Sequence, residues 1–381
     1  MSNNNNIYIE LHALQNFAPS NLNRDDTGSP KDCEFGGVRR ARISSQCLKR
    51  SMREAPVFAE TTGVEKALRT KRIKQQIREK LAEEQATAEM VEAILDDTVK
   101  ALLSKLDKDG ERTAVLLYMS DSELQDIADS ITDKWSDLVD EKARAGAVKE
   151  INKVLTKKFK GRTSAPDIAL FGRMLAESPE LNIDAACQVA HALSTHRVTM
   201  EMDFYTAVDD LNPDDSAGAG MMGFSGYDSA CFYRYMRLDW NQLTENLDSE
   251  ALSQKTVEGF IRSAIEAVPS GKQNSSAANN PPSLLMAVVR NSGMGWSMAN
   301  AFEKPIRPTA DSGFVEPSVK KLDEYWGRMK AVYGEKSIQS VAVLGLDANL
   351  PLASLADYQV AGTDAMIAQV LGALPSNGET A

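Results

Sequence analysis

The sequence has few of the residues from which metal and catalytic sites are usually built. Its 381 residues include four cysteines and three histidines. The cysteines are scattered, and no two of them form the CxxC spacing of a zinc site. No disulfide framework is indicated either, so we expect reduced thiols and predict no metal or other cofactor. The four cysteines are Cys33, Cys47, Cys187 and Cys231.

Long apolar runs are also missing. No stretch reaches the length of a membrane span, and the opening residues MSNNNNIYIE have neither the basic nor the apolar region of a secretion signal. We therefore expect a cytoplasmic protein without membrane contact. Hydrophobic residues make up 43% of the chain and charged residues 25%, which is ordinary for a globular protein of two or three domain-sized units.

Positive charge is scarce in the chain as a whole but is concentrated in one stretch. The net charge is -11, yet residues 31–53 carry +5 and the rest of the chain carries -16. A basic island in an acidic protein indicates a local anionic partner. Gly36 and Gly37 are expected to let the backbone approach that ligand closely. The predicted phosphate ligands are Lys31, Arg39, Arg40, Arg42, Lys49, Arg50 and Arg53, and Ser44 and Gln46 are able to donate further hydrogen bonds.

The second half of this basic stretch is predicted to be a helix. Ser44 is a favourable N-cap residue and Pro56 ends any helix that follows, so we expect a helix over residues 45–55. Leu48 and Met52 point toward a core in this helix, whereas Gln46, Lys49, Arg50 and Arg53 share the other face. A solvated surface helix after an arginine-rich loop is the alternative interpretation.

The remaining patterns predict an α+β fold. A half-buried strand is expected at residues 7–14, with Ile7, Ile9 and Leu11 on its inner side. Residues 57–165 favour helix, and within them residues 81–140 contain sixteen acidic and five basic residues. Without this insertion, the order is strand, helix, strand, strand, helix, strand, which fits an RRM-like or ferredoxin-like βαββαβ fold. Strands are also predicted at 167–174, 187–199, 230–239 and 284–291, and helices at 249–267 and 317–332.

Several motifs resemble those of one family. They are LNRDD at 22–26, KD at 31–32, FGGVRRARISSQCLKRSMR at 35–53, DIALFGRM at 167–174, FYTAVDDL at 204–211, FYRY at 232–235 and SMANAFEK at 297–304. These motifs occur in family order over most of the chain. The sequence is similar to the CasC-type backbone subunit of the type I-E CRISPR Cascade, an antiviral surveillance complex.

This resemblance implies both a domain organisation and a function. An RRM-like palm would contain residues 1–56, 166–200 and 230–381, helical fingers residues 57–165, and a protruding thumb loop residues 201–229. The chain would be a non-catalytic RNA-binding subunit that polymerises head to tail along the crRNA guide. It would present the guide bases to target DNA, and would meet other Cascade subunits and an effector nuclease through the complex.

The resemblance also implies roles for residues outside the basic stretch. Met174, Phe204, Tyr205 and Val208 would displace a base, and Lys272 would contact backbone phosphate. By themselves, Phe204, Tyr205 and Val208 fit a small core patch, and Lys272 fits a solvated loop residue. Two positions depart from the family pattern: Val38 interrupts the usual basic run, and the family often has a larger ring at the position of Phe204.

Two rival functions follow from other features. A metal-dependent ribonuclease acting on repeat RNA would use His12 with Asp25 and Asp26. A general single-strand-binding protein unconnected with CRISPR would use the same basic stretch. The string at residues 218–223 fits GxGxxG, but it follows a turn and precedes a predicted strand, so the context of a dinucleotide site is missing.

Overall fold

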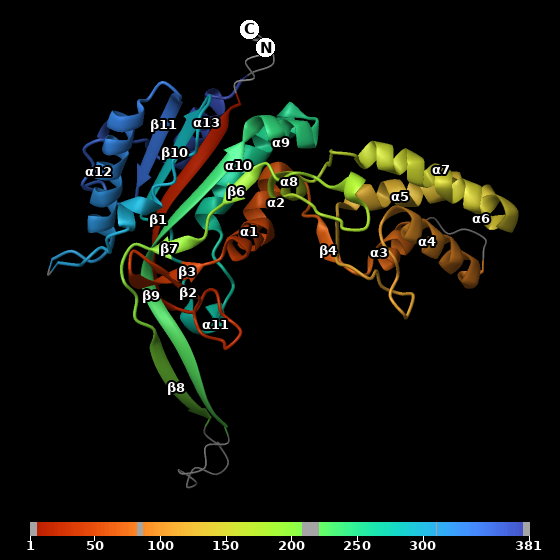
Figure 1. Ribbon diagram of the computed structural model, residues 1–381, viewed down its shortest axis with the longest axis horizontal. Coiled ribbons are helices and arrows are strands. Elements are labelled where there is room, and N and C mark those ends of the chain that lie inside the picture. The colour runs from red at the N-terminus through yellow and green to blue at the C-terminus, as the bar shows by residue number, and fades with distance from the viewer. Residues whose placement is uncertain (1–5, 82–86, 208–220, 310, 376–381) are drawn as a thin grey trace. The chain divides into compact units, whose positions relative to one another are not determined.

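The chain folds into two compact units. Figure 1 shows the computed structural model, which describes residues 6–81, 87–207, 221–309 and 311–375. Unit 1 is assembled from residues 1–58, 188–237 and 260–381, and unit 2 from residues 59–187 and 238–259. Both units therefore combine segments that are far apart in the sequence. Among the described residues, none of the helices combines the length and the apolar character that a membrane crossing requires.

Unit 1 is built on one sheet. Its strands lie in the order β11-β10-β1-β9-β7-β3-β2, and β6 and β8 also pair with β9. The paired strands β1 and β10 are antiparallel, from Tyr8 opposite Arg290 to Leu14 opposite Leu284. This antiparallel sheet with its helices agrees with the predicted α+β class. The strands are β1 (Tyr8–Ser20), β2 (Asp32–Phe35), β3 (Val38–Ile43), β6 (Cys187–Val189), β7 (Ala192–Ser194), β8 (Glu201–Ala207), β9 (Met221–Asp239), β10 (Leu284–Arg290) and β11 (Ile338–Gly345).

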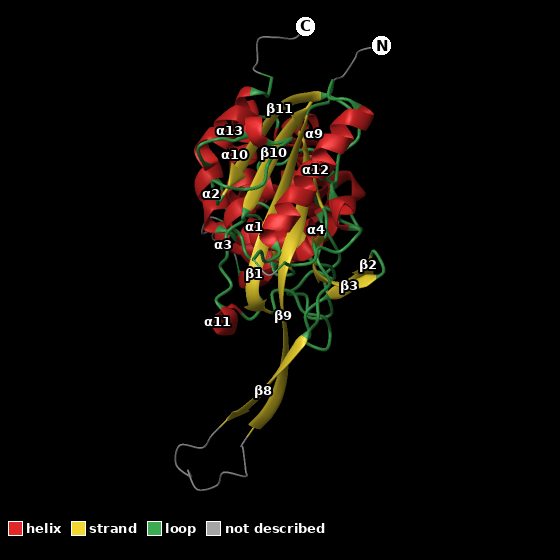
Figure 2. Ribbon diagram, turned by 90° about the vertical axis from the view of Figure 1, so that its left-hand side faces the viewer, coloured by secondary structure: helices red, strands yellow, loops and turns green. Residues whose placement is uncertain are grey.

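Strand β1 is buried on both faces, which corrects the prediction of a half-buried strand. Glu10 and His12 are as inaccessible as Ile9 and Leu11. Helix α12 (Val315–Tyr333) packs Trp326 into a core with residues of β1, β9, β10 and β11. Figure 2 shows α12 and α13 (Thr363–Gly372) on opposite sides of the strands, so both faces of the sheet are covered.

The predicted basic helix is confirmed as α1 (Ser45–Glu54). The side chain of Ser44 accepts a hydrogen bond from the backbone N–H of Cys47, and Leu48 and Met52 are buried. The other helical segments of unit 1 are α2 (Pro56–Thr62), α11 (Gln273–Ser276), η2 (Ala299–Phe302) and η3 (Ala356–Tyr358); α2 and α10 (Glu250–Glu266) each cross between the two units.

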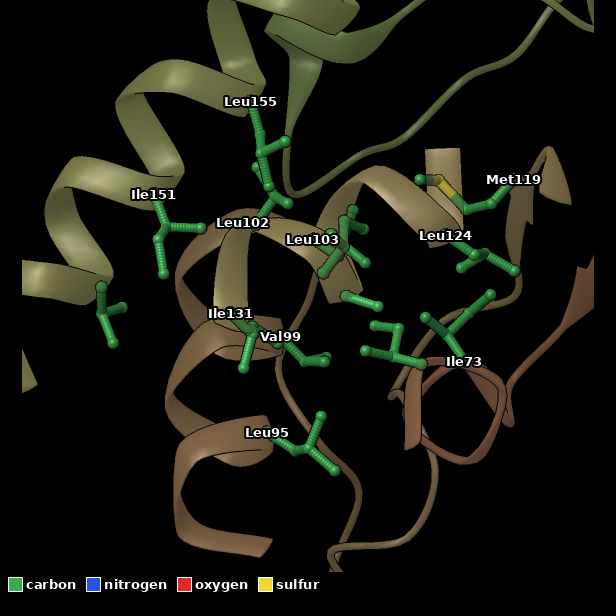
Figure 3. Close-up of a cluster of buried hydrophobic side chains, with 14 of the residues drawn as sticks. Ile73, Leu95, Val99, Leu102, Leu103, Met119, Leu124, Ile131, Ile151 and Leu155 are labelled. Carbon is green, nitrogen blue, oxygen red and sulfur yellow. The ribbon is translucent and has the colours of Figure 1, made fainter. Parts of the chain in front are cut away.

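Unit 2 is mainly helical. Apolar side chains at helical spacing on α4, α5 and α7 meet in one core, and Figure 3 shows Leu95, Val99, Ile131 and Ile151 in this cluster. A short pair of strands, β4 and β5, lies beside these helices. The elements are β4 (Leu68–Thr70), α3 (Ile73–Lys80), α4 (Ala88–Leu102), β5 (Leu117–Met119), α5 (Asp121–Asp133), α6 (Trp135–Val139), α7 (Glu141–Phe159), α8 (Pro166–Phe171), η1 (Pro179–Leu181) and α9 (Trp240–Leu247).

The predicted strand at residues 167–174 is wrong. Residues 166–171 form helix α8, with Pro166 in the first turn and Gly172 at its end with a positive φ of 78°. This segment therefore lies in unit 2 and adds no strand to the sheet of unit 1. The carboxylate of the buried Asp167 accepts hydrogen bonds from the hydroxyl of Tyr118 and the backbone N–H of Ala67.

The predicted loop at residues 201–229 is also corrected where the structure describes it. Strands β8 and β9 form an antiparallel ribbon, with Glu201 opposite Tyr227 and Phe204 opposite Phe224. Figures 1 and 2 both show this ribbon extending away from the rest of the sheet. Each strand brings alternate side chains to the two faces of the ribbon.

Candidate nucleic-acid interface

The β2–β3 hairpin places only part of the basic stretch at the surface. Successive side chains of a strand point to opposite faces, so Arg39 and Arg40 point in opposite directions. The side chain of Arg39 is 62% exposed, and its Nε lies 2.8 Å from Oδ2 of Asp32. Arg42 is half-buried and donates from Nε to the carbonyl of Asp32 and from Nη1 to Nδ1 of His191.

Arg40 is buried, which corrects its prediction as a phosphate ligand. Its guanidinium donates to backbone carbonyls of Phe35, Ser194, Phe302 and Glu303. The side chain is fully inaccessible to solvent, so it cannot contact a ligand at the surface in this conformation.

Gly36 also has a different role from the one predicted for the double glycine. Gly36 has a positive φ of 62° and packs directly against the backbone of Glu303. The close approach that requires this glycine is therefore made to the protein itself, whereas Gly37 has open space where a side chain would be.

Helix α1 exposes two of the four residues predicted on its outer face. Gln46 and Arg50 are exposed, and Lys49 is half-buried. Arg53 has only 11% of its side chain exposed and pairs with Glu54. Nearby, Lys31 is half-buried and the Ser44 side chain serves as the helix cap.

A cleft of about 800 Å³ lies beside α1. Arg24 and Arg50 contribute positive charge to its lining, and Asp25, Asp26, Glu54 and Glu266 contribute negative charge. One wall comes from the loop that carries Gly271, and the exposed Lys272 follows directly with a positive φ of 51°. The cleft therefore has room for a nucleotide-sized group, but its charge is mixed.

A second hollow, of about 460 Å³, has a purely basic set of charged residues. It is lined by Arg39 and Arg197 together with Gly37, Val38, Val198, Thr199 and Met200. Arg197 is exposed and was not predicted. Its proximity to Arg39 depends on the pairing of β3 with β7, for example Arg42 opposite Leu193, so only strand pairing would have revealed it.

The β8–β9 ribbon carries a group of exposed aromatic and apolar side chains. Phe204 and Phe224 face each other across the ribbon with ring centres 5.3 Å apart, and they are 52% and 70% exposed. Tyr205 is 44% exposed and Met202 is 56% exposed. These side chains do not form the core patch considered above. Phe224 was missed, and Val208 lies outside the described residues.

Met174 belongs to unit 2, where it follows α8 and is 83% exposed. Methionine side chains are usually buried, so packing alone does not explain the exposure of Met174.

A row of lysines occupies one face of α7 in unit 2. The spacing of the four helical lysines keeps them within about 80° of the helix circumference and spreads them over about 22 Å. All five are exposed, and none forms an ion pair with a described residue. By contrast, Lys158 on another face of the helix pairs with Asp126 at 2.7 Å. The lysine row consists of Lys142, Lys149, Lys153 and Lys157 on α7, together with Lys160, the extended residue that directly follows the helix.

Two of the residues suggested for a nuclease, His12 and Asp25, have hydrogen-bond partners within the protein. His12 is fully buried, its Nδ1 lies 2.8 Å from the hydroxyl of Tyr233, and burial lowers its pKa to about 4. The Asp25 carboxylate accepts hydrogen bonds from Thr27 and Ser29 within its own loop. In the described part of the chain, no three His, Cys, Asp or Glu side chains are grouped to hold a metal ion.

Comparisons with known proteins find one family and closely similar folds. A family model described as "CT1975-like protein" matches residues 9–370. A chain of a solved "CRISPR RNA-guided surveillance complex, pre-nicking" is 31% identical, with 96% of this chain and 99% of that chain covered and a TM-score of 0.83. A chain of another "CRISPR RNA-guided surveillance complex" is 27% identical, with coverage of 96% and 100% and a TM-score of 0.73. A comparison with curated protein sequences finds no match.

Proposed function

The chain belongs to the CT1975-like protein family, and from this membership we propose that it is the backbone subunit of a CRISPR RNA-guided surveillance complex. The motifs that resemble CasC-type subunits favour a type I-E Cascade. The observation that carries the proposal is the full-length similarity to a chain of such a complex, together with exposed arginines around two hollows of unit 1.

In this proposal the protein contacts the sugar-phosphate backbone of the guide RNA. It works in the cytoplasm and performs no catalysis. Arg39, Arg197 and Arg50 would contact phosphates, with Gln46 and Lys272 donating further hydrogen bonds. Phosphate contacts carry no sequence information. This mode of binding suits a subunit that must accept guides of any sequence. Copies would join head to tail, because a repeated heterologous contact gives an open filament along the RNA.

We propose that unit 1 is an RRM-like palm. Its central strands lie in the order β10-β1-β9-β7, and α1 and α10 occur in the chain between β1 and β7 and between β9 and β10. This is the βαββαβ succession expected of that fold. Unit 2 would then be the fingers and the β8–β9 ribbon the thumb.

The thumb would separate bases. Phe204, Phe224 and Tyr205 present aromatic rings at the surface of the ribbon, and an exposed ring gives a displaced or flanking base a surface on which to stack. Met174 would support a base in the same way through its exposed thioether.

Phosphate contacts of the palm can be tested by RNA binding at several salt concentrations. The double variant R39Q/R50Q should bind unrelated guide RNAs equally poorly and show a salt slope smaller by about 1.4, because each lost contact to a single strand removes about 0.7. K320Q, which removes an exposed cation from α12, is the matched control and should bind as the wild type does.

An unchanged salt slope in R39Q/R50Q would contradict the proposed interface. Magnesium-dependent cleavage of repeat RNA, abolished in H12A, would favour the ribonuclease alternative instead. Copurification of random cellular RNA would favour a general single-strand-binding protein.

We further propose that the lysine row of α7 contacts the target DNA. Four of its five ammonium groups lie along one face of a helix, none of the five pairs with a described residue, and this arrangement suits the closely spaced phosphates of a duplex. In guide-loaded assemblies, K149Q/K153Q/K157Q should weaken target binding and reduce its salt slope, and should leave guide binding unchanged. K158Q, on the same helix but in an ion pair with Asp126, is the control. Equal target binding by the triple variant and wild type would contradict this role.

A further inference from the structure

Arg40 connects three separate parts of unit 1. Its Nε donates to the carbonyl of Phe35 at 3.1 Å, and its Nη1 donates to that of Ser194 at 3.0 Å. Its Nη2 donates to the carbonyls of Phe302 at 2.7 Å and Glu303 at 3.2 Å. The planar guanidinium thus joins the turn of the β2–β3 hairpin, the end of β7 and the end of η2.

Gly36 strengthens the same connection. A Cβ atom at this position would lie 1.8 Å from the carbonyl oxygen of Glu303, far inside contact distance. The turn is therefore seated directly on the Glu303 backbone, and its positive φ of 62° is a second reason for glycine.

The segment that receives Arg40 is itself held firmly. The backbone N–H of Trp296 donates to the buried carboxylate of Glu10 at 2.9 Å, and that of Met298 donates to the hydroxyl of Tyr233 at 2.8 Å. Further along, the N–H of Ile306 donates to the carbonyl of Thr195 at 3.0 Å. Residues 296–306 are therefore anchored to the sheet by hydrogen bonds. Arg40 in turn anchors the turn of the hairpin to this segment.

The turn carries the exposed arginine of the hairpin. Arg39 directly precedes Arg40, points to the opposite face and lines the 460 Å³ hollow with Arg197. The carbonyl of Arg39 also accepts a hydrogen bond from the N–H of Val198, the residue after Arg197. This bond links the segments that carry the two arginines, and the turn held by Arg40 and Gly36 lies within three residues of Arg39.

We propose that Arg40 is a positioning residue: with Gly36 it holds the turn on residues 302–303, so that Arg39 and Arg197 face the same RNA phosphate. The identification of the ligand as an RNA phosphate rests on the proposed function. Lysine is a poor replacement here, because its three N–H groups radiate from a single nitrogen, whereas the contacts of Arg40 are made from three nitrogens spread over a planar fork.

The first test uses variants that remove no positive charge. R40K and G36A should each weaken guide RNA binding about tenfold, the effect expected when one charge-assisted contact is lost. A residue that binds phosphate directly would be largely rescued by lysine. Wild-type affinity in R40K would therefore overturn the proposal.

A mutant cycle tests whether Arg40 acts through its neighbours. In an R39Q/R197Q background, R40K should have little further effect on RNA binding, because the groups that it positions are gone. An undiminished effect of R40K in that background would overturn the proposal.

Hydrogen exchange without RNA separates this inference from the proposed function. The backbone amides of residues 35–39 should exchange faster in R40K and G36A than in the wild type. Unchanged exchange in both would overturn the positioning role, whereas a wild-type protein that binds no RNA would refute the proposed function alone. If R40K does not fold, G36A supplies both measurements.

Discussion

Single buried polar residues decide much of what the surface of unit 1 can do. Arg39 and Arg40 are adjacent and chemically identical, yet one is 62% exposed and the other is fully buried. The sequence predicts both as phosphate ligands. Alternation along a strand places the two side chains on opposite faces, but the sequence does not show which of these faces the rest of the protein covers. The covering groups, Ser194 and residues 302–303, are remote in sequence, so only the folded chain reveals them.

Asp228 gives a prediction at the same scale. It is 9% exposed, and burial, with a smaller effect of Asp32, raises its pKa to about 7. Because this pKa is higher in the folded state than in the unfolded state, the carboxyl contributes stability below about pH 4 that is lost as the pH rises to about 7. D228N removes this loss and should be more stable than wild type at pH 8 by a few kcal/mol.

Urea unfolding of both proteins at several pH values measures this difference. The advantage of D228N should be nearly constant above about pH 7 and should shrink steadily as the pH falls from about 7 to about 4. A difference that does not change with pH would show that Asp228 titrates normally.

Among the helices and strands, the local sequence was sufficient to predict α1 but not α8 or β8. Ser44, Leu48 and Met52 supply the cap and the apolar face of α1 within a few residues of one another. The apolar run at residues 168–171 fits either a strand or a helix, and Pro166 at the start of α8 favours the helix. Strand β8 was not predicted, because it forms by pairing with β9, which is remote from local sequence signals. Its adjacent aromatic residues are both exposed, so the sequence lacks the usual alternation between apolar and polar residues.

The β8–β9 ribbon also yields a prediction. F204A/F224A should leave the free energy of unfolding nearly unchanged, because both rings are largely exposed. The same variant should lower the affinity of guide-loaded assemblies for complementary target by about 1–3 kcal/mol for each base that loses its stacking partner. Titration of assemblies with labelled target measures this loss.

V332A, which truncates a side chain that is 72% exposed elsewhere in unit 1, is the control for the aromatic pair. Equal target affinity of F204A/F224A, V332A and wild type would exclude a stacking role for the ribbon.

At the scale of the whole molecule, net charge gives little information about the partner. The chain carries -11, yet each unit presents a basic surface: Arg39 of the β2–β3 hairpin with Arg197 in unit 1, and the lysine row in unit 2. In the proposed function, acidic residues elsewhere would limit nonspecific adhesion to nucleic acid, and the two basic surfaces would confine binding to two faces. The family motifs indicated the kind of partner, whereas the folded chain determined which cations are exposed.

The most direct test of the account is to map the protein residues that crosslink to guide RNA in the intact assembly. We predict crosslinks in the segments that contain Arg39, Arg50 and Arg197 and on the aromatic residues of the β8–β9 ribbon, with the same pattern for guides of unrelated sequence. Crosslinks that avoid these segments, or that change with the guide sequence, would contradict the central claim that this surface holds RNA by its backbone.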